Sequence, residues 1–355
     1  TPAEPAPAAT EEPAATEAPA EESAAETVMF TDSCGREVEL PANITKIAPS
    51  GTVATMILAA FAPEELVCVG TTVSENQIPY LYDGIADLPV TGQLYGGKAT
   101  LNLEELLGTG AEVIIDLGDF KKSIADDLTA LQEQTGLPCV FIEADLAHLA
   151  DAFRTLGTIL GKEERGEELA KLVEETMTMA AENSAKITEE QQLSVLYSSG
   201  GDPLGTNAEG SSQAQALGIV GAKNAVVLED VSNKGGGNMI NMEQLYNFDP
   251  DVILFSDGSI YDTVADDSAW SQLTAISTGK YYEVPSSPYN WLSGPPSMNM
   301  ILGVWWLGNL IYPEIYDYDM ETMTQELYKT LWGYELSSEE VTALLGNSTL
   351  KAAAQ

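Results

Sequence analysis

Short apolar runs alternate with segments of helical periodicity along most of the chain. Runs such as ELVCVG, AEVIIDLG and LPCVFIE are rich in β-branched residues and bounded by polar or turn residues, which is typical of buried strands. Between them, segments such as LNLEELLGTG and SIADDLTALQEQTG space their apolar side chains as one face of a helix does and end at glycine. The alternation predicts an α/β fold whose central sheets are mostly parallel.

A break in this alternation predicts two lobes and a connector. Residues 146–187 carry no strand signal, and Gly161 divides them into two helices. The second helix, near residues 163–187, would be about 38 Å long, which is enough to run along two domains. We therefore expect an N-terminal α/β lobe over residues 28–160, a connecting helix over 161–189 and a C-terminal α/β lobe over 190–355.

The second half of the chain repeats the first in pattern. The stretch MINMEQLYNFDPDVILFSDG mirrors ATLNLEELLGTGAEVIIDLG. Each has a polar lead-in, a helix with an acidic first turn, a break, and a strand that ends near Asp and Gly. This internal echo supports two lobes of similar construction.

The N-terminal segment, residues 1–27, differs in composition from the rest. It consists of Ala, Pro, Glu and Thr apart from Ser23. Such a segment cannot bury enough apolar surface to offset chain entropy, so we expect a disordered, extended tether. The following stretch, VMFTDSCGREVELP, alternates around Gly35 and predicts a β-hairpin.

Charge and the rare residue types exclude several classes of site. Lys and Arg total 15 against 55 Asp and Glu, a net charge of −40 that opposes binding to nucleic acid or anionic lipid. His148 is the single histidine, which excludes a multi-histidine metal site, and we expect it to be an ordinary helix residue. The cysteines form no CxxC pair. Cys68 and Cys139 fall in predicted strands as small buried side chains, and the pairing of these two and Cys34 stays open. The apolar stretch 300–312 is too short for a membrane span, which predicts a buried helix.

Several motifs in series resemble one family. DSCGREVELPANITKIAPS is similar to the opening hairpin and first strand of the ABC-importer substrate-binding proteins that handle iron chelates, haem and cobalamin. LNLEELLGTGAEVIID and NMEQLYNFDPDVILF resemble that family's paired helix–strand elements, and LGTILGKEERGEELAKLVEE resembles its long connecting helix. WSQLTAISTGKYYEVP and the helix ending in LIYPE resemble its C-terminal lobe, so the resemblance covers residues 29–315.

This resemblance implies a fold, a location and partners. It implies two lobes joined by one rigid helix, with a small-molecule ligand held in the cleft between them. It also implies an extracytoplasmic monomer, lipid-anchored to the outer face of the cytoplasmic membrane, that delivers its ligand to an ABC permease. The family places a glutamate early in the first helix of each lobe for permease docking, but TVATMILAAF has none. Glu64 and Glu65, in the turn after this helix, are the candidates to replace it, and Glu209 is the candidate in the corresponding region of the second lobe.

Ligands of parallel α/β lobes meet the loops at the carboxyl ends of the strands. We expect aromatic side chains in these loops, above all Tyr289 and Trp291, to form a wall against a flat or bulky ligand. Ser293 and a helix start at Ser297 would suit an oxyanion or carboxylate. The candidate ligand-binding residues are Ser50, Gly51, Tyr95, Lys98, Phe120, Lys121, Lys234, Tyr261, Tyr289, Trp291, Ser293 and Ser297.

The scarcity of arginine bears on the charge of the ligand. Arg36, Arg154 and Arg165 are the only three, and none falls in these loops. A highly anionic ferric catecholate needs several guanidinium partners, so the pattern favours a neutral or weakly charged chelate, a corrinoid or a small oxyanion. Within the resembled family we expect an iron–siderophore, haem or corrinoid ligand, with molybdate or tungstate as the alternative. We expect no intrinsic cofactor and no metal bound directly by protein side chains.

Two other function classes remain open. An enzyme such as a hydrolase could use an acidic pair drawn from Asp116, Asp119, Asp202 and Asp257. No nucleophile–base arrangement is readable, so we expect a binding protein without catalytic residues. A surface adhesion or scaffold protein would bind a macromolecule and would show no saturation by a small molecule.

Overall fold

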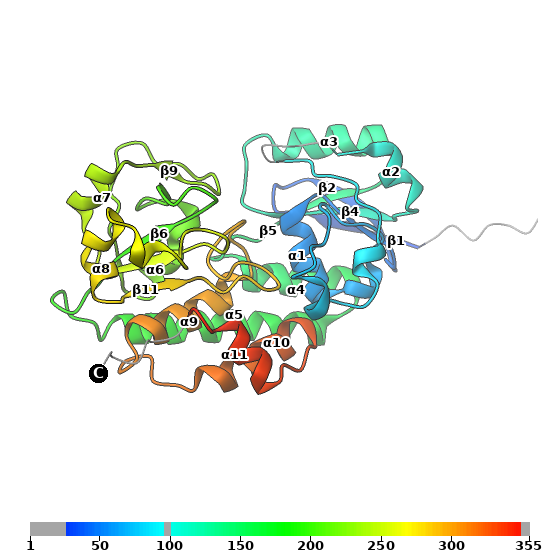
Figure 1. Ribbon diagram of the computed structural model, residues 1–355. Helices are drawn as coiled ribbons and strands as arrows, with labels where there is room; N and C mark the ends of the chain where they lie inside the picture. The colour runs from blue at the N-terminus through cyan, green and yellow to red at the C-terminus, as the bar shows by residue number, and fades with distance from the viewer. Residues whose placement is uncertain (1–25, 96–100, 349–355) are drawn as a thin grey trace, which may run out of the picture.

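Two α/β lobes stand side by side on a layer of helices (Figure 1). The computed structural model describes residues 26–95 and 101–348. The candidate Lys98, and all but the last two residues of the tether expected over 1–27, lie outside the described residues.

The first lobe is built on a three-stranded parallel sheet in the order β3–β4–β5. Its strands are β3 (Ile47–Pro49), β4 (Val113–Gly118) and β5 (Cys139–Glu143), and its helices are α1 (Thr52–Phe61), α2 (Leu103–Gly108) and α3 (Ile124–Thr135). Every residue of β4 is buried, as expected of a central parallel strand covered on both faces. Isolated parallel bridges from Ile47 to Leu66 and from Val69 to Val90 extend the pairing.

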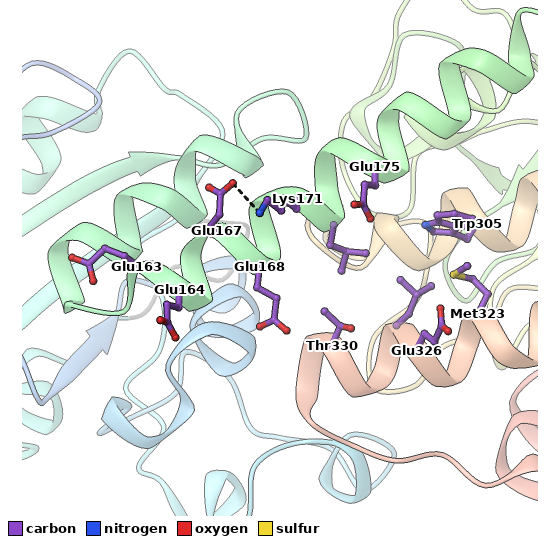
Figure 2. A pocket seen from close by; sticks show the side chains of 12 residues that line it. Glu163, Glu164, Glu167, Glu168, Lys171, Glu175, Trp305, Met323, Glu326 and Thr330 are labelled. Carbon is purple, nitrogen blue, oxygen red and sulfur yellow. Dashed lines mark ion pairs between the residues drawn. The ribbon is translucent and has the colours of Figure 1, made fainter.

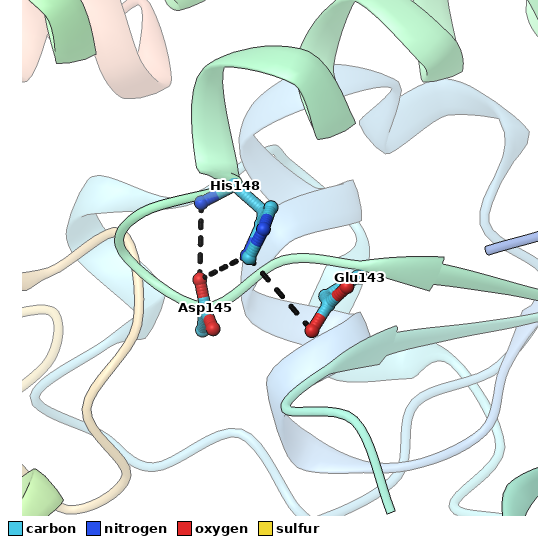
Figure 3. Close-up of side chains that lie close together, drawn as sticks. All are labelled: Glu143, Asp145 and His148. Carbon is cyan, nitrogen blue, oxygen red and sulfur yellow. Dashed lines mark hydrogen bonds and ion pairs between the residues drawn. The ribbon is translucent and has the colours of Figure 1, made fainter. Parts of the chain in front are cut away.

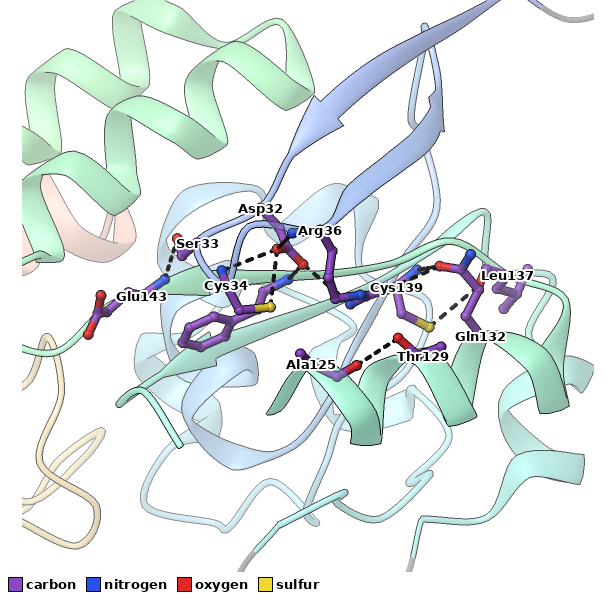
Figure 4. A network of polar contacts seen from close by, with 11 residues as sticks. Asp32, Ser33, Cys34, Arg36, Ala125, Thr129, Gln132, Leu137, Cys139 and Glu143 are labelled. Atoms are coloured by element: carbon purple, nitrogen blue, oxygen red, sulfur yellow. Dashed lines mark hydrogen bonds and ion pairs between the residues drawn. The ribbon is translucent and has the colours of Figure 1, made fainter. Parts of the chain in front are cut away.

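An N-terminal hairpin is fastened to the edge of this sheet (Figure 4). Its antiparallel strands are β1 (Thr27–Thr31) and β2 (Glu37–Pro41), as the alternation around Gly35 predicts. The carboxylate of Asp32 accepts the backbone N–H of Arg36 at 2.9 Å and closes the turn. The backbone N–H of Ser33 donates to the carbonyl of Phe141 at 2.9 Å, which ties the turn to β5.

The cysteines are free thiols within the first lobe. Cys68 and Cys139 are buried, as predicted, and Cys34 is half-buried beside the hairpin turn. Burial is the main reason that the pKa of Cys139 is raised to about 12 and that of Cys34 to about 11. These thiols are therefore protonated and inert near neutral pH.

The second lobe contains a six-stranded sheet in the order β11–β10–β6–β7–β9, with β8 also beside β6. The strands are β6 (Ser194–Ser198), β7 (Gly205–Thr206), β8 (Lys223–Asn224), β9 (Asn238–Met239), β10 (Val252–Phe255) and β11 (Tyr281–Glu283). The helices are α6 (Gln215–Ile219), α7 (Met242–Phe248) and α8 (Thr274–Ser277). Strands β6, β8, β10 and β11 are parallel, so the mostly parallel α/β fold predicted from the sequence is confirmed.

Short 3-10 turns fill connections in both lobes. They are Pro63–Glu65, Ile78–Tyr80, Ile85–Asp87, Ser212–Ala214, Val264–Asp266 and Trp270–Gln272.

A helical layer joins the lobes along one side (Figure 1). It consists of α4 (Leu149–Leu160), α5 (Glu163–Ser184), α9 (Met300–Ile311), α10 (Met320–Trp332) and α11 (Ser338–Leu344). Helix α5 has 22 residues and passes under both lobes, while Gly161 ends α4 in a left-handed conformation. The long connecting helix predicted from the periodicity is therefore present.

The C-terminal helices add a second connection between the lobes. Helix α10 contacts α1 of the first lobe as well as α9. The Arg165 guanidinium donates to the carbonyls of Ala60, at 2.8 Å, and Leu331, at 3.2 Å. The Tyr80 ring lies 5.4 Å from that of Tyr328, edge to face. Helix α10, which the sequence assigns to the second lobe, therefore also packs on the first lobe and makes the connection between the two lobes stiffer.

Helix α9 is buried on nearly all sides, as predicted for the apolar stretch 300–312. The Trp305 indole N–H donates to the hydroxyl of Thr176 on α5 at 2.9 Å. Within the described ranges, no helix combines the length and apolar character that crossing a membrane requires.

Candidate functional site

A cavity of about 540 Å³ lies between the two lobes, and we call it the inter-lobe cleft. The first lobe contributes the segments at the carboxyl ends of β3, β4 and β5, which is where parallel sheets place their sites. The cleft is lined by Ser50, Gly51, Thr52, Val53, Ala54, Gln93, Tyr95, Asp116, Leu117, Gly118, Asp119, Lys121, Ala144, Ser212, Gln213, Asn233, Gly294, Pro295 and Pro296.

Asp116 is the buried carboxylate of the first-lobe wall. It lies inside β4 and is only 4% exposed. One of its oxygens, Oδ1, accepts a short hydrogen bond from the Ser50 hydroxyl, and the other, Oδ2, has no hydrogen-bond partner. Burial raises the pKa of Asp116, and the Ser50 hydrogen bond and Lys121 oppose that rise. An acceptor atom is therefore left unused at the wall of the cleft.

Tyr95 and Lys121 lie beside Asp116. The Tyr95 hydroxyl is buried without a partner, and burial, together with Asp116 and Asp127, raises its pKa. The Lys121 ammonium lies 4.4 Å from the centroid of the Tyr95 ring. It also donates to the carbonyl of Asp119 at 3.3 Å. The first-lobe wall thus combines one ammonium, two carboxylates and one phenol.

Close backbone packing fixes the bottom of this wall. A Cβ built on Gly70 would lie 2.5 Å from the carbonyl carbon of Gly51, so Gly70 leaves room for the cleft backbone. The Gly70 N–H donates to the Thr55 hydroxyl at 3.0 Å, and Thr55 donates to the Gly51 carbonyl at 2.8 Å. The Thr52 hydroxyl donates to Gln93 Oε1 at 3.0 Å. The start of α1 is therefore held in place before any ligand binds.

The second-lobe wall carries no charged side chain among the described lining residues. The Ser212 N–H donates to Asn233 Oδ1 at 2.8 Å, and the Gln213 amide donates to the Asn233 carbonyl at 3.3 Å. Pro295 and Pro296 supply apolar surface without N–H donors. The two walls therefore differ, with ionisable groups on the first lobe and neutral groups on the second.

Four of the predicted ligand-binding residues line the cleft: Ser50, Gly51, Tyr95 and Lys121. Asp116, the buried carboxylate, also lines the cleft, although the sequence suggests it only for the hydrolase alternative. The signal that could have found it is a carboxylate inside the apolar run VIIDLG, because a buried strand tolerates a charge only where something compensates it. Gln93 and Gln213 gave no such signal, since nothing in their local pattern distinguishes them from surface glutamines.

The predicted aromatic wall is wrong for Trp291. This side chain is 0% exposed, and its indole N–H donates to the Ser287 carbonyl at 3.2 Å. Its ring packs edge to face on Trp306 with 6.4 Å between centroids. Tyr289 is half-buried against the same core, 6.3 Å from the ring of Trp332. These rings bury their area in the helical layer instead of the cleft.

The predicted oxyanion position at Ser297 is also wrong. Helix α9 begins at Met300, and the Asn299 side chain accepts the Ser297 N–H at 2.8 Å. The Ser293 hydroxyl is within 2.9 Å of the Tyr197 hydroxyl. Neither serine is among the lining residues, and Gly294 between them faces the cleft instead.

The remaining candidates lie apart from the cleft lining. Phe120 is 52% exposed and lies 6.3 Å from the Phe141 ring. Tyr261 packs 5.5 Å from Tyr281 in the second lobe. Lys234 is exposed in a loop whose neighbouring residue, Asn233, does line the cleft.

The three candidate docking glutamates have different surroundings. Glu65 pairs with the Lys162 ammonium at 2.6 Å at the start of α5, so it is not a free docking group. Glu64 is exposed beyond the end of α1 that lies away from the cleft, and Glu209 is exposed on the second lobe. The arginines are all engaged elsewhere, as Arg154 is with Glu167 at 2.8 Å.

A larger groove of about 840 Å³ lies on the helical layer, not between the lobes (Figure 2). Helix α5 supplies most of its acidic side chains, and Trp305 and Met323 supply its apolar part. Lys171 is the one basic residue of its described lining and pairs with Glu167 at 3.7 Å. Because neither sheet presents strand ends here, this groove lacks the construction of the inter-lobe cleft.

His148 lies outside the cleft, in a small cluster with two carboxylates (Figure 3). Its Nδ1 is 2.7 Å from Asp145 Oδ1 and 3.9 Å from Glu143 Oε1. The hydrogen bond to Asp145 and the charges of both carboxylates raise the pKa of His148. As predicted, the histidine lies at a helix start, where it precedes α4.

Comparisons with known proteins point to one family. The family model described as "Periplasmic binding protein" matches residues 52–288. Two Bacillus subtilis (strain 168) proteins are similar over about two thirds of their length. They are "Uncharacterized ABC transporter substrate-binding lipoprotein YvrC", 21% identical over 62% of this chain and 68% of its own, and "Putative ABC transporter substrate-binding lipoprotein YhfQ", 26% identical over 58% and 66%. A solved structure, "ABC transporter solute binding protein from Sulfurospirillum deleyianum DSM 6946", superposes with a TM-score of 0.81 at 27% identity and covers 90% of this chain and 99% of that chain.

Proposed function

Because this chain belongs to the periplasmic binding protein family, we propose that it is the substrate-binding component of an ABC importer and that it carries its ligand in the inter-lobe cleft. The observation that carries the proposal is the cleft itself, which both lobes line and in which Asp116 and Tyr95 keep unused polar atoms. Buried polar groups without partners are costly, and a bound ligand relieves that cost.

We propose a chelate-sized ligand: an iron–siderophore, a haem or a corrinoid. The cleft volume of about 540 Å³ lies within the range of about 300–1,000 Å³ that is usual for small-molecule sites. A tetrahedral oxyanion such as molybdate has four oxygens and would fill roughly 120 Å³, if each oxygen takes about the 30 Å³ of one water. The volume therefore favours the larger ligand over the oxyanion.

We propose binding without turnover. Of the carboxylates considered for a hydrolase, Asp116 and Asp119 line the cleft, whereas Asp202 and Asp257 do not. No histidine or cysteine is among the described lining residues, so the serines there have no imidazole base. The surface-adhesion alternative receives no support from a site enclosed between two lobes.

The location and membrane partner belong to the same proposal. The similar Bacillus proteins are named as substrate-binding lipoproteins, which supports an extracytoplasmic, lipid-anchored protein working with an ABC permease. We propose Glu64 and Glu209, one exposed carboxylate on each lobe, as the permease contacts. The double variant Glu64→Ala/Glu209→Ala should keep ligand affinity and lose stimulation of ATP hydrolysis by the reconstituted transporter. Unchanged stimulation would reject these two residues as contacts.

A thermal-shift screen tests the ligand proposal. The panel contains ferric hydroxamates, ferric catecholates, haem, cobalamin, molybdate and tungstate. A ligand at 100 times its dissociation constant stabilises the protein by about 2.7 kcal/mol, which raises the midpoint by several degrees. One saturable chelate, haem or corrinoid hit, weakened by Tyr95→Ala, supports the proposal. A hit with molybdate or tungstate alone would replace the ligand class, and hits unaffected by Tyr95→Ala would place binding outside the cleft.

A further inference from the structure

Two buried polar atoms on one wall of the cleft have no partner within the described structure. They are Asp116 Oδ2 and the Tyr95 hydroxyl. The unpaired carboxylate oxygen matters more, because Asp116 is 4% exposed and its other oxygen already takes the Ser50 hydroxyl. A buried acceptor left without a donor costs stability in the empty protein. Such a loss of stability is expected at a binding site, because there the ligand supplies the missing donor.

The charged residues around Asp116 determine whether a cationic or an anionic group of the ligand fits there. Asp116 and Asp119 are the acidic lining residues, and Lys121 is the one basic lining residue in the described cleft. Among the described residues, the second-lobe lining has no charged side chain and offers no guanidinium. An oxyanion would therefore meet two carboxylates and a single ammonium, without the forked donors that usually hold such ligands.

The position of Lys121 shows that a positive charge is stable at this wall. Its ammonium lies 4.4 Å from the centroid of the Tyr95 ring, where the ring face and the nearby carboxylates attract a cation. The Lys121 charge also acts to lower the pKa of Asp116 against the larger effect of burial, which raises it. A cationic group of a ligand that displaces this ammonium would meet the same ring face and the same carboxylates.

Resting on the proposed function, we infer that Asp116 accepts a hydrogen bond from an ammonium or N–H group of the ligand, so that the cleft selects chelates that carry such a donor and rejects oxyanions. Asp116 is suited to this role because it is anchored within β4 and oriented by Ser50. The Tyr95 hydroxyl, also unpartnered, supplies a second contact beside it.

A matched pair of ligands tests the inference on the full chain. Ferrioxamine B is a ferric trihydroxamate with a free ammonium, and its N-acetyl derivative keeps the chelate but has no charge there. Isothermal titration should show ferrioxamine B binding at least tenfold more tightly than the acetylated form. Asp116→Asn should remove most of that preference, whereas Asp126→Asn, which removes an exposed charge from α3, should preserve it.

The outcomes separate the inference from the function on which it rests. Equal affinity for the two ferrioxamines overturns the inference and leaves chelate binding intact. A preference that survives in Asp116→Asn also overturns it, because the ammonium is then recognised elsewhere. Binding of neither ferrioxamine, with saturable binding of molybdate, overturns both the inference and the chelate proposal. Tyr95→Phe, which removes only a hydroxyl, gives a second variant and should weaken both ferrioxamines several-fold.

Discussion

The Lys121 ammonium lies 4.4 Å from the centroid of the Tyr95 ring, within the wall of the inter-lobe cleft. A cation over an exposed aromatic ring contributes about 0.5–1 kcal/mol, which is too little to fix Lys121 there against a competing charge. The pair is therefore a contact that a ligand can displace. It joins the segment after β4 to the segment that carries Gln93 and Tyr95.

Replacing Lys121 should strengthen the binding of a cationic chelate. Lys121→Gln removes the ammonium that occupies the Tyr95 face, so the affinity for ferrioxamine B should rise about threefold to tenfold, given that a tenfold change is about 1.4 kcal/mol. Isothermal titration measures the change. Lys122→Gln removes the same charge from an exposed neighbour outside the cleft lining and should change affinity less than twofold. Weaker binding by Lys121→Gln would show that the ammonium helps to hold the ligand.

Trp291→Ala should act on stability, not on the ligand. The side chain is fully buried against Trp306, so its truncation should cost about 3–5 kcal/mol of unfolding free energy. Urea denaturation measures this loss. Phe120→Ala is the matched aromatic control, since Phe120 is 52% exposed and a surface change there should stay within about 0.5 kcal/mol. A stable Trp291→Ala protein with reduced ligand affinity would restore the aromatic-wall hypothesis.

The sequence placed Ser50, Gly51 and Lys121 at the cleft because topology decides which loops meet there. The residues that follow neighbouring parallel strands lie at the same edge of the sheet. The position at which a strand ends is therefore enough to predict that the next residues lie at the cleft. The same rule predicts the loop that carries Tyr95, which also lines the cleft.

The prediction for Trp291 is wrong because the direction of this side chain depends on packing against residues distant in the sequence. Its loop lies between a strand and a helix, and local pattern is the same whether the ring faces the cleft or the helical layer. Helices α9 and α10, which follow in the chain, provide the rings on which it packs, Trp306 and Tyr328. The role of Asp116 cannot be predicted from the sequence for a related reason, because the partners of its two carboxylate oxygens depend on residues distant in the chain, such as Ser50.

Gly303→Ala should disrupt the contact that holds the Trp291 segment. A Cβ at Gly303 would collide with the Trp291 carbonyl, which is backbone and cannot swing aside. Overpacking of this kind costs about 1–3 kcal/mol. Gly218→Ala on α6 is the matched control, because a Cβ there meets nothing within 4 Å, and the exchange should be neutral or stabilising by up to about 1 kcal/mol. Thermal denaturation of both variants checks the contrast, and equal midpoints would contradict it.

His148 should titrate above its ordinary pKa. The hydrogen bond to Asp145 and the charges of Asp145 and Glu143 favour the imidazolium. The single histidine gives one set of imidazole proton signals, so an NMR titration reads this pKa directly. Asp145→Asn should lower it toward the usual value of about 6.5, and Asp151→Asn should lower it less.

The raised pKa of His148 also determines how its contribution to folding stability changes with pH. Because the folded pKa is the higher one, the contribution of His148 is complete below the unfolded value of about 6.5 and disappears as the pH rises through the folded value. A pKa in the wild-type protein equal to that of Asp145→Asn would contradict the role of Asp145.

Asp116→Asn should stabilise the empty protein near neutral pH. Burial raises the folded pKa of Asp116 above its unfolded value of about 3.9, so this group destabilises the fold progressively as the pH rises above that unfolded value, and the loss is complete once the pH exceeds the folded value. Asparagine keeps an oxygen for the Ser50 hydroxyl and removes the buried charge. The midpoint of thermal unfolding should therefore exceed that of the wild type at pH 7, and the difference should shrink as the pH falls toward 4. If the variant unfolds at a lower temperature than the wild type at pH 7, other groups already stabilise the ionised carboxylate in the empty cleft. That result would contradict the proposal that its free oxygen needs a donor from the ligand.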